Sequence, residues 1–329
     1  MSQPPPLLEL ERLSIGYRTA RGIVSAVDDV SLRIPRGASV GLVGESGSGK
    51  STIALGLMRL LPENAVVSGR MRFDGVDLAA LPERQLNRQW RWQRLAMVFQ
   101  KSLSAMSPVH RIGMQMHDVL GMHESQLSET ARTARIEAVL QAVHLPKRVL
   151  RSYPFELSGG MMQRTMIALG LLCNPPFVIF DEATTALDVI TQAQILTEIE
   201  RLKEEFDLTT MVISHDVGVI NAVTDTVAVL YAGQLMEVAP RARFFAAPLH
   251  PYSRALIGSV PRLGGPKRRF SGIPGGLPDL VDPPAGRRFA PRCPHATAGS
   301  MTRTPPLVEV EPGHLVRCTE FSMRDEVPA

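Results

Sequence analysis

The N-terminal stretch alternates polar and apolar positions in a way that predicts β-structure. Leu8, Leu10 and Leu13 interleave with charged residues. A second apolar series follows at mostly even spacing: Val24, Ala26, Val30, Leu32 and Ile34. Side chains two positions apart point to the same face of a strand. We therefore expect this stretch to form strands with one buried face.

Farther along, short apolar runs alternate with helical spacing. Residues 40–43 form an apolar run that ends in glycine and predicts a buried strand, and residues 94–100 predict another. Within residues 50–61 the apolar side chains fall three and four positions apart, which is the period of a helix. Strands that alternate with helices favour an α/β core.

The middle of the chain, about residues 102–172, changes character and predicts a helical insertion into that core. Ser128 is placed to cap a helix whose apolar residues share one face. Strand signal returns at residues 177–180 and 209–214, with a helix between them. A hairpin is predicted over residues 227–238, with Gly233 near its turn.

The composition shifts after Pro240. Proline and glycine cluster there, so we expect residues 1–239 to form the main domain and residues 240–329 a small loop-rich appendage. Basic residues gather at 267–269 and 287–292. These basic clusters have two interpretations: a solvated surface, or a contact with lipid headgroups or an acidic partner loop.

Composition then excludes several classes of protein. The 329 residues are 44% apolar and 21% charged, with a net charge of +4. This is ordinary globular usage, and the charge excess is too small to indicate nucleic acid by itself. Three cysteines do not make a disulfide scaffold and fit a reducing compartment. The longest apolar run, about residues 166–173, is far below the roughly 20 residues of a membrane-spanning helix, and no secretory signal is visible.

The first chemical motif is a phosphate loop. Residues 44–51 read Gly-Glu-Ser-Gly-Ser-Gly-Lys-Ser, which is G-x-x-x-x-G-K-S between a predicted strand and a predicted helix. Glycines let successive backbone N–H groups point at phosphate oxygens, and the helix N-terminus adds its positive dipole end. In this motif Lys50 reaches the β- and γ-phosphates, and Ser51 offers a hydroxyl to Mg²⁺. The loop predicts binding of a nucleoside triphosphate.

Polar residues at the ends of three later strands complete the candidate chemistry. The apolar run 177–180 ends in Asp181 and Glu182, where Asp181 is placed to hold Mg²⁺ and Glu182 to polarise the attacking water. His215 follows another strand and is either a structural residue or a hydrogen-bond partner of the γ-phosphate. Gln100 ends a third, and its amide could meet Mg²⁺ or the attacking water.

A second anion-ready helix start follows the middle block. Leu157-Ser158-Gly159-Gly160 precedes Met161 and opens a predicted helix. One fold does not need two such sites for one nucleotide. Two chains meeting head to tail would use both, because each phosphate loop would be covered by the Leu-Ser-Gly-Gly segment of the other chain. With these elements in this order, residues 7–240 resemble the ATP-binding subunits of ABC transporters.

The resemblance implies a fold and a set of site residues. The fold is an α/β P-loop NTPase core with an antiparallel β subdomain, a helical subdomain at about residues 102–172, and the small C-terminal appendage. Glu182, His215, Gln100 and Lys50 form the implied catalytic set, and Mg²⁺ is implied at Ser51, Gln100 and Asp181. The implied ATP-binding residues are Tyr17, stacked on adenine, Gly44, Ser46, Gly47, Ser48, Gly49, Lys50, Ser51 and Thr52, with Ser158, Gly159, Gly160 and Asp188 acting across the dimer.

Two positions depart from the common pattern of the family. Met161 stands where the most widespread signature has glutamine, and methionine is common there in the oligopeptide and dipeptide branch. Ala183 replaces the usual proline after the Asp-Glu pair, which loosens a turn but removes no catalytic group. We therefore expect a hydrolysing site.

The appendage resembles the C-terminal segment of dipeptide, oligopeptide and nickel importer ATPases. The resemblance lies in His-Pro-Tyr at 250–252 and in residues 289–294. Many relatives hold an iron–sulfur cluster here with four cysteines. This chain keeps Cys293 and Cys318, with Arg287 and Ser300 at the other two positions, so we expect no such cluster. A metal shared with His295 or His314 stays an open alternative.

The resemblance implies the motor subunit of an importer for di- and oligopeptides. Its implied partners are a second, homologous ATPase subunit, more often in a heterodimer than a homodimer, two membrane permease subunits, and indirectly an extracytoplasmic binding protein, with no nucleic acid. The implied location is the cytoplasmic face of the inner membrane. Alternatives are an importer ATPase for nickel or another small solute, and a non-transport ATPase acting on nucleic acid or the ribosome. The interval between Lys50 and Leu157 is too short for the coiled coils of genome-maintenance relatives.

Overall fold

The structure is a computed structural model that describes residues 5–99, 105–185, 187–259 and 273–318. The chain divides into two compact units. We call them the β-rich unit, which comprises Leu8–Ile34, Val40–Val76 and Ser214–Ala329, and the helical unit, which comprises Met1–Leu7, Pro35–Ser39 and Asp77–Ile213. Each unit is described by itself.

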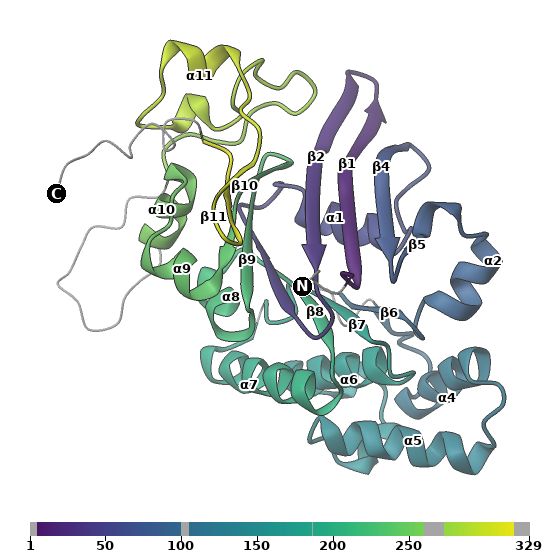
Figure 1. Cartoon of the computed structure of the whole chain (residues 1–329). Helices are drawn as coiled ribbons and strands as arrows, with labels where there is room; N and C mark the ends of the chain where they lie inside the picture. Colours follow the sequence, from purple (N-terminus) through teal and green to yellow (C-terminus); the bar gives the residue numbers. More distant parts are fainter. Residues whose placement is uncertain (1–4, 100–104, 186, 260–272, 319–329) are drawn as a thin grey trace. The chain divides into compact units, whose positions relative to one another are not determined.

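An antiparallel sheet of four strands forms one part of the β-rich unit, in the order β2-β1-β4-β5. The strands are β1 (Leu8–Thr19), β2 (Gly22–Ile34), β4 (Ala65–Phe73) and β5 (Val76–Asp77). Leu8 pairs with Ile34 and Leu10 with Leu32, and all four are buried. Figure 1 shows β1, β2 and β4 side by side. The even spacing of apolar residues therefore predicted strands β1 and β2 correctly, whereas it did not predict β4 and β5.

A second group of strands in the β-rich unit runs in the order β11-β12-β10-β9-β3. These are β3 (Ser39–Val43), β9 (Thr226–Tyr231), β10 (Gln234–Pro240), β11 (Val308–Glu311) and β12 (His314–Val316). Strand β3 runs parallel to β9, and β9 and β10 form the predicted hairpin, which turns at Ala232 and Gly233. The C-terminal strands β11 and β12 extend this group from β10.

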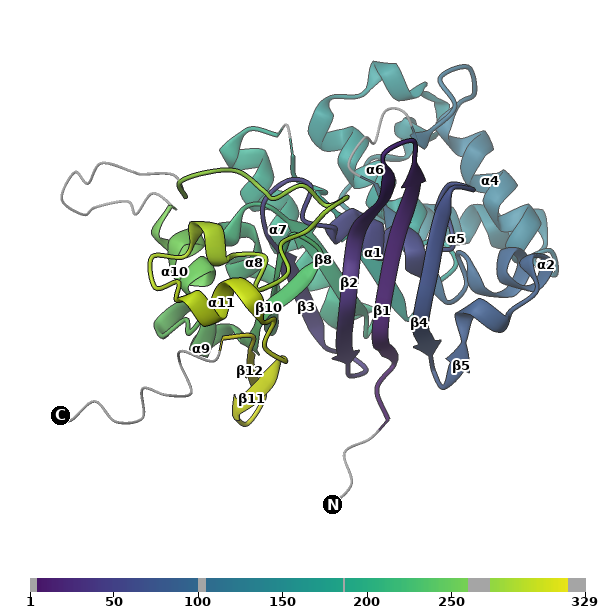
Figure 2. The same ribbon diagram turned by 90° about the horizontal axis from the view of Figure 1, so that it is seen from above.

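Short helices accompany these strands (Figures 1 and 2). They are α1 (Lys50–Leu57), α8 (Val217–Val223), α9 (Arg241–Ala246), α10 (Pro251–Gly258), α11 (Ala298–Thr302) and the 3₁₀ turn Ala290–Arg292. Helix α1 ends before the predicted Leu61. Arg59 adopts φ 50°, and the amides of Arg59 and Leu60 donate to the carbonyls of Gly56 and Leu55. This pattern of bonds ends a helix with a left-handed residue, here without glycine.

Three parallel strands in the order β8-β7-β6 form the sheet of the helical unit. They are β6 (Leu95–Val98), β7 (Phe177–Asp181) and β8 (Thr209–Ser214), and their residues are buried. Burial on both faces explains their continuous apolar runs. The helices are α4 (Ile112–His123), α5 (Glu129–Ala142), α6 (Gly159–Leu171) and α7 (Val189–Glu205), with α2 (Glu83–Gln85) and short turns at Leu78–Ala80, Leu86–Trp90, Lys147–Arg151 and Pro154–Glu156.

Side-chain chemistry explains where α5 begins and how α7 is held. The Ser128 hydroxyl accepts a hydrogen bond from the Ala131 amide, so the predicted N-cap is confirmed. Glu198 on α7 is 6% exposed. Its carboxylate lies 2.8 Å from Arg201 on α7, 3.0 Å from His144 just after α5, and 3.4 Å from Arg164 on α6.

Among the described residues, no helix is long and apolar enough to cross a membrane.

Candidate functional site

The phosphate loop follows β3 and leads into α1 within the β-rich unit, in the strand–loop–helix context predicted for it. Gly49 has φ 102°, and a Cβ there would lie 2.3 Å from the Ala26 carbonyl oxygen. A Cβ at Gly44 would lie 2.0 Å from the Leu230 carbonyl oxygen. Both positions therefore require glycine, because the backbone approaches closely. Gly47 also has a positive φ, 80°.

Lys50 is folded back over this loop. Its side chain is buried, and Nζ donates to the carbonyl oxygens of Gly44 at 2.8 Å and Glu45 at 2.9 Å. Ser48 is buried beside it, and its carbonyl accepts from the Gly233 amide of the β9–β10 turn. Ser46 and Ser51 are exposed. The ammonium of Lys50 thus stands at the loop where the motif requires a cation for phosphates.

Tyr17 lies next to the first turn of α1. It is half-buried on β1, and its hydroxyl donates to Thr52 Oγ1 at 3.4 Å. The fold therefore brings the predicted aromatic residue to the phosphate-loop helix. Its stacking on adenine stays a prediction.

The acidic pair ends β7 in the helical unit. Asp181 is 7% exposed. Glu182 adopts φ 49°, its amide donates to the Ile213 carbonyl at 2.9 Å, and its carboxylate accepts from Thr185 Oγ1 at 3.3 Å. A left-handed conformation at a residue other than glycine is strained, and such strain is concentrated at functional sites. Nine other non-glycine residues of the described chain also have a positive φ, so this geometry positions Glu182 but does not by itself mark it as catalytic.

The Leu-Ser-Gly-Gly segment and the residues around Asp188 are neighbours in the helical unit. Ser158 caps α6 by accepting from the Met161 amide. A Cβ on Gly160 would lie 2.8 Å from Thr191 Cγ2 on α7. Asp188 caps α7, accepting from the amide and hydroxyl of Thr191 at 2.9 Å and 2.6 Å, and these hydrogen bonds lower the pKa of its carboxyl. The Leu-Ser-Gly-Gly segment and Asp188, both predicted to act across the dimer, are thus neighbours within one chain.

Two further predicted positions are His215 and Gln100. His215 follows β8 directly and is exposed, and Asp216 after it caps α8 by accepting from the Gly218 amide. Gln100, which was predicted to bind Mg²⁺, lies outside the described residues.

Comparison with known proteins decides the family. A family model described as ABC transporter matches residues 27–185, and one described as oligopeptide/dipeptide transporter, C-terminal region, matches residues 236–299. The chain is 41% identical to the oligopeptide transport ATP-binding protein OppD of Haemophilus influenzae, over 95% of this chain and 97% of that protein. It is 42% identical to OppD of Salmonella typhimurium, over 95% and 93% of the two chains. The chain belongs to the family of ABC transporter ATP-binding proteins.

Solved structures agree with the family. The ATP-binding cassette MJ0796, in a dimeric post-hydrolysis state bound to ADP and Pi, has a TM-score of 0.63 at 26% identity, covering 71% of this chain and 98% of that one. The predicted α/β fold of an ABC ATPase is confirmed. CbiO1 from Clostridium perfringens shares the fold, with a TM-score of 0.63 at 22% identity and 74% coverage of this chain. Family membership also confirms that the chain is an ATPase.

Sequence reasoning missed residues of the C-terminal region that contact the phosphate loop. Arg292 Nη1 lies 3.0 Å from both carboxylate oxygens of Glu45, and the Tyr252 hydroxyl accepts from the Glu45 amide at 3.0 Å. Tyr252 lies in the His-Pro-Tyr segment and Arg292 in the basic cluster 287–292. The only sequence signal was their occurrence in two segments that resemble importer ATPases.

Two of the three cysteines of this ATPase, Cys173 and Cys318, are buried, and Cys293 is half-buried. All three lie in the described part of the chain, and none forms a disulfide. Arg287, which occupies one of the expected cluster positions, donates from Nη1 to Cys318 Sγ at 3.1 Å. Within the described ranges there is no group of three or more His, Cys, Asp or Glu side chains that could hold a metal ion. The expected lack of an iron–sulfur cluster stays a prediction.

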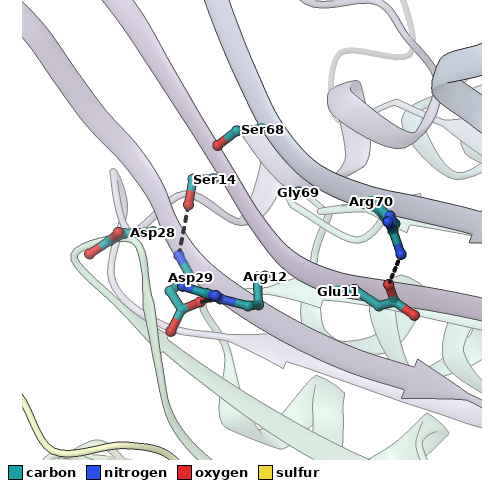
Figure 3. A pocket seen from close by; sticks show the side chains of 8 residues that line it. All are labelled: Glu11, Arg12, Ser14, Asp28, Asp29, Ser68, Gly69 and Arg70. Atoms are coloured by element: carbon teal, nitrogen blue, oxygen red, sulfur yellow. Dashed lines mark hydrogen bonds and ion pairs between the residues drawn. The ribbon is translucent and has the colours of Figure 1, made fainter.

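A hollow lies on the antiparallel sheet of the β-rich unit (Figure 3). Four of its five charged side chains are paired with one another, Arg12 with Asp29 at 3.1 Å and Arg70 with Glu11 at 3.6 Å. The fifth, Asp28, pairs with Arg288 at 2.8 Å. The Ser14 hydroxyl accepts from the Asp29 amide. Because each of these charged side chains already has a counter-charge, this hollow offers no unpaired charge to an ionic ligand.

Proposed function

We propose that this chain is the ATP-hydrolysing motor subunit of an ABC importer for di- and oligopeptides. One observation carries the proposal: the similarity to oligopeptide transport ATP-binding proteins runs through 95% of the chain and includes the C-terminal region. A family ATPase alone would account for residues 27–185. The matched C-terminal region supports the narrower peptide cargo.

The proposed chemistry assigns one task to each group. Lys50 and the loop amides bind the β- and γ-phosphates of ATP, and Tyr17 contacts adenine. Glu182 acts as the general base for the attacking water, with His215 and Gln100 contributing at the γ-phosphate. Magnesium fits the donor set, since hydroxyl and carboxylate oxygens such as those of Ser51 and Asp181 are its preferred ligands. When bound, it would neutralise charge on the phosphates.

The proposed working unit is a head-to-tail dimer of ATPase subunits, homologous rather than identical. Ser158, Gly159, Gly160 and Asp188 would face the nucleotide bound by the partner subunit. Exposed apolar residues support this: Val189 and Ile190, directly after Asp188, are 82% and 72% exposed. Such a pair of apolar side chains beside a polar loop is typical of a protein interface.

The ATPase pair would work on two separate permease subunits at the cytoplasmic face of the inner membrane. An extracytoplasmic binding protein would deliver peptides to those permeases. Within this proposal, residues 1–239 form the ATPase domain, with its helical subdomain at about residues 102–172, and residues 240–329 form the peptide-importer C-terminal domain.

Uptake by cells tests the cargo. Labelled dipeptides, oligopeptides and nickel are offered to cells that carry the wild type or Lys50→Ala, with Lys147→Ala as control because that lysine is an exposed side chain of the helical unit. We expect Lys50→Ala to abolish peptide uptake and to leave nickel uptake and the control unchanged. Loss of nickel uptake alone would keep the motor and change the cargo. Unchanged uptake of both would contradict the proposal.

A further inference from the structure

Glu45, the second residue of the phosphate loop, is joined to the C-terminal region by two contacts. Arg292 Nη1 lies 3.0 Å from both Oε1 and Oε2 of Glu45. The Glu45 amide donates to the Tyr252 hydroxyl at 3.0 Å. Side chain and main chain of Glu45 are therefore both held by residues more than 200 positions away in the sequence. All three residues belong to the β-rich unit.

Arg292 is also held by contacts other than the one with Glu45. Its Nε donates to the Pro274 carbonyl at 2.7 Å, and its Nη2 donates to the Ile273 carbonyl at 3.0 Å. The guanidinium carbon lies 5.6 Å from the centre of the Tyr231 ring, and the side chain is only 5% exposed. A guanidinium held on three sides keeps its charge at one place.

Tyr252 is equally rigid. Its side chain is fully buried and packs against the rings of Tyr231 and Phe289 at 4.7 Å and 5.2 Å between centroids. Burial raises the pKa of its hydroxyl well above the ordinary value, so the group stays protonated and neutral. A neutral hydroxyl accepts the Glu45 N–H bond without adding negative charge to the loop.

The charge of Glu45 explains why these contacts matter. A carboxylate within a loop that binds a triphosphate repels the ligand, and like charges at short range cost free energy even near a protein surface. Glu45 also contributes its carbonyl to Lys50 Nζ at 2.9 Å, so a shift of Glu45 displaces the acceptor that orients this ammonium. The fixed positive charge of Arg292 beside Glu45 offsets this repulsion, and the contact also holds the phosphate loop in place.

We propose that Arg292 is a positioning residue for ATP: it neutralises Glu45 and, with Tyr252, holds the phosphate loop in its binding conformation. The C-terminal region is thereby part of the ATP-binding machinery of this chain. The proposal rests on the proposed assignment of the phosphate loop as the ATP site. It adds that Arg292, which need not touch the nucleotide, sets ATP affinity through Glu45.

Equilibrium binding of a fluorescent ATP analogue to the full-length chain tests the proposal. The variants are Arg292→Gln, Glu45→Gln and the double variant, with Arg243→Gln as the matched control. Arg243 also pairs with a carboxylate in the C-terminal region, at 2.5 Å from Glu311, but that carboxylate lies on β11 and not in the phosphate loop. The kcat and KM of ATP hydrolysis are measured in the assembled transporter.

We expect Arg292→Gln to raise the Kd and KM for ATP about tenfold, within the usual range of coupling between contacting charged groups. The kcat should change less than about twofold, since the chemistry is untouched. Removing the carboxylate as well should restore the Kd to within about threefold of wild type. A purely structural loss would not be rescued this way. The Arg243→Gln chain should bind like wild type.

Two outcomes would overturn the proposal: wild-type ATP affinity in Arg292→Gln, or a double variant as weak as that single variant. If Arg292→Gln does not fold, Arg292→Lys decides: its ammonium keeps the charge beside Glu45 but loses the bonds to the carbonyls of residues 273 and 274, so the Kd should rise by less than about tenfold. A tenfold loss in this lysine variant would contradict neutralisation. Lys50→Ala separates the two levels: if it binds ATP normally, the proposed site is wrong and not merely the role of Arg292.

Discussion

At the scale of single residues, the most informative position is Glu182. It combines a motif position after Asp181 with a left-handed backbone, φ 49°, that its neighbours hold in place. The Glu182 amide donates a hydrogen bond to the Ile213 carbonyl, and the Thr185 hydroxyl donates one to the Glu182 carboxylate. Arg59 and Ala232 share this backbone conformation, so the motif position and the hydrogen bonds, rather than φ alone, single out Glu182.

Replacing the carboxylate of Glu182 should separate ATP binding from hydrolysis. In Glu182→Gln the side chain keeps its size but cannot take a proton from water, so we expect turnover to fall by about 100-fold or more. Binding of ATP should stay within about twofold of wild type. Single-turnover hydrolysis in the assembled transporter measures this, with Glu200→Gln, an exposed position on α7, as control. Full turnover in Glu182→Gln would refute the general-base assignment.

Gly49 shows how strictly the loop backbone is defined. A methyl group there would lie 2.3 Å from the Ala26 carbonyl oxygen, and the φ of 102° is unfavourable for any other residue. We therefore predict that Gly49→Ala loses ATP binding, by at least about tenfold, because the loop must shift. Gly75→Ala is the control, since Gly75 also has a positive φ, 78°, but nothing lies within 4 Å of the place its added methyl group would take. Equal binding by both variants would contradict this reading of the loop.

At the scale of elements, a buried carboxylate ties α7 to its neighbours. Glu198 pairs with Arg201, His144 and Arg164. Burial alone would raise the pKa of this carboxyl, but the hydrogen bonds from Arg201 and His144 lower it, so Glu198 stays ionised. We expect Glu198→Ala to lower the free energy of unfolding by about 2 kcal/mol, because Arg201 and Arg164 lose their counter-charge.

Urea unfolding of the full chain measures the Glu198 effect. Glu204→Ala, an exposed position on the same helix, serves as the matched control and should unfold like wild type. If Glu198→Ala proved as stable as Glu204→Ala, the ion-pair cluster would contribute nothing and the packing of α7 would rest on its apolar residues alone.

Helix α10 carries a histidine cap that predicts a pH dependence. His250 is buried and accepts the Tyr252 amide at Nδ1, and burial lowers its pKa to about 3 although Glu237 opposes the shift, while Arg287 and Arg317 favour it. The unfolded chain binds a proton at this residue below about pH 6.5, and the folded chain does not. The contribution of His250 to folding stability is therefore fully present above pH 6.5, and the folding stability falls as the pH drops below that value.

His250→Asn keeps a capping side chain and removes the titration. Between pH 6.5 and 5, wild type should lose up to about 1.4 kcal/mol more per pH unit than this variant. Buried His123, whose pKa burial also lowers, contributes equally to both chains and cancels in the difference. Exposed His295→Asn is the control and should follow wild type. Parallel pH profiles for His250→Asn and wild type would contradict the prediction.

At the scale of the whole molecule, local signals in the sequence were reliable and distant contacts were not. The Ser128 cap, the β9–β10 hairpin and the phosphate loop depend on neighbouring residues, and all three were predicted. Helix α1 ended early because a non-glycine residue, Arg59, took the left-handed turn that glycine usually marks. The pairing of Glu45 with Arg292 spans 247 residues and has no local signature.

The candidate site follows the same rule. The positions of Lys50, Glu182 and His215 were predictable, because Lys50 opens α1 and the other two directly follow β7 and β8, while their catalytic roles stay predictions. The C-terminal residues that hold the loop became visible only when the chain was folded, since Tyr252 acts through an aromatic cluster and Arg292 through carbonyls of residues 273 and 274. Tertiary contacts, rather than motifs, placed them.

Measuring ATP hydrolysis and peptide transport in one preparation tests most directly whether this chain drives peptide import. The transporter, purified through a tag on this chain and reconstituted in vesicles, is assayed for ATP hydrolysis and labelled oligopeptide accumulation, for wild type and Glu182→Gln. We predict that peptide stimulates hydrolysis in wild type, that accumulation requires ATP, and that Glu182→Gln abolishes both together. Peptide accumulation that continued at the wild-type rate in Glu182→Gln would contradict the claim that this chain drives peptide import.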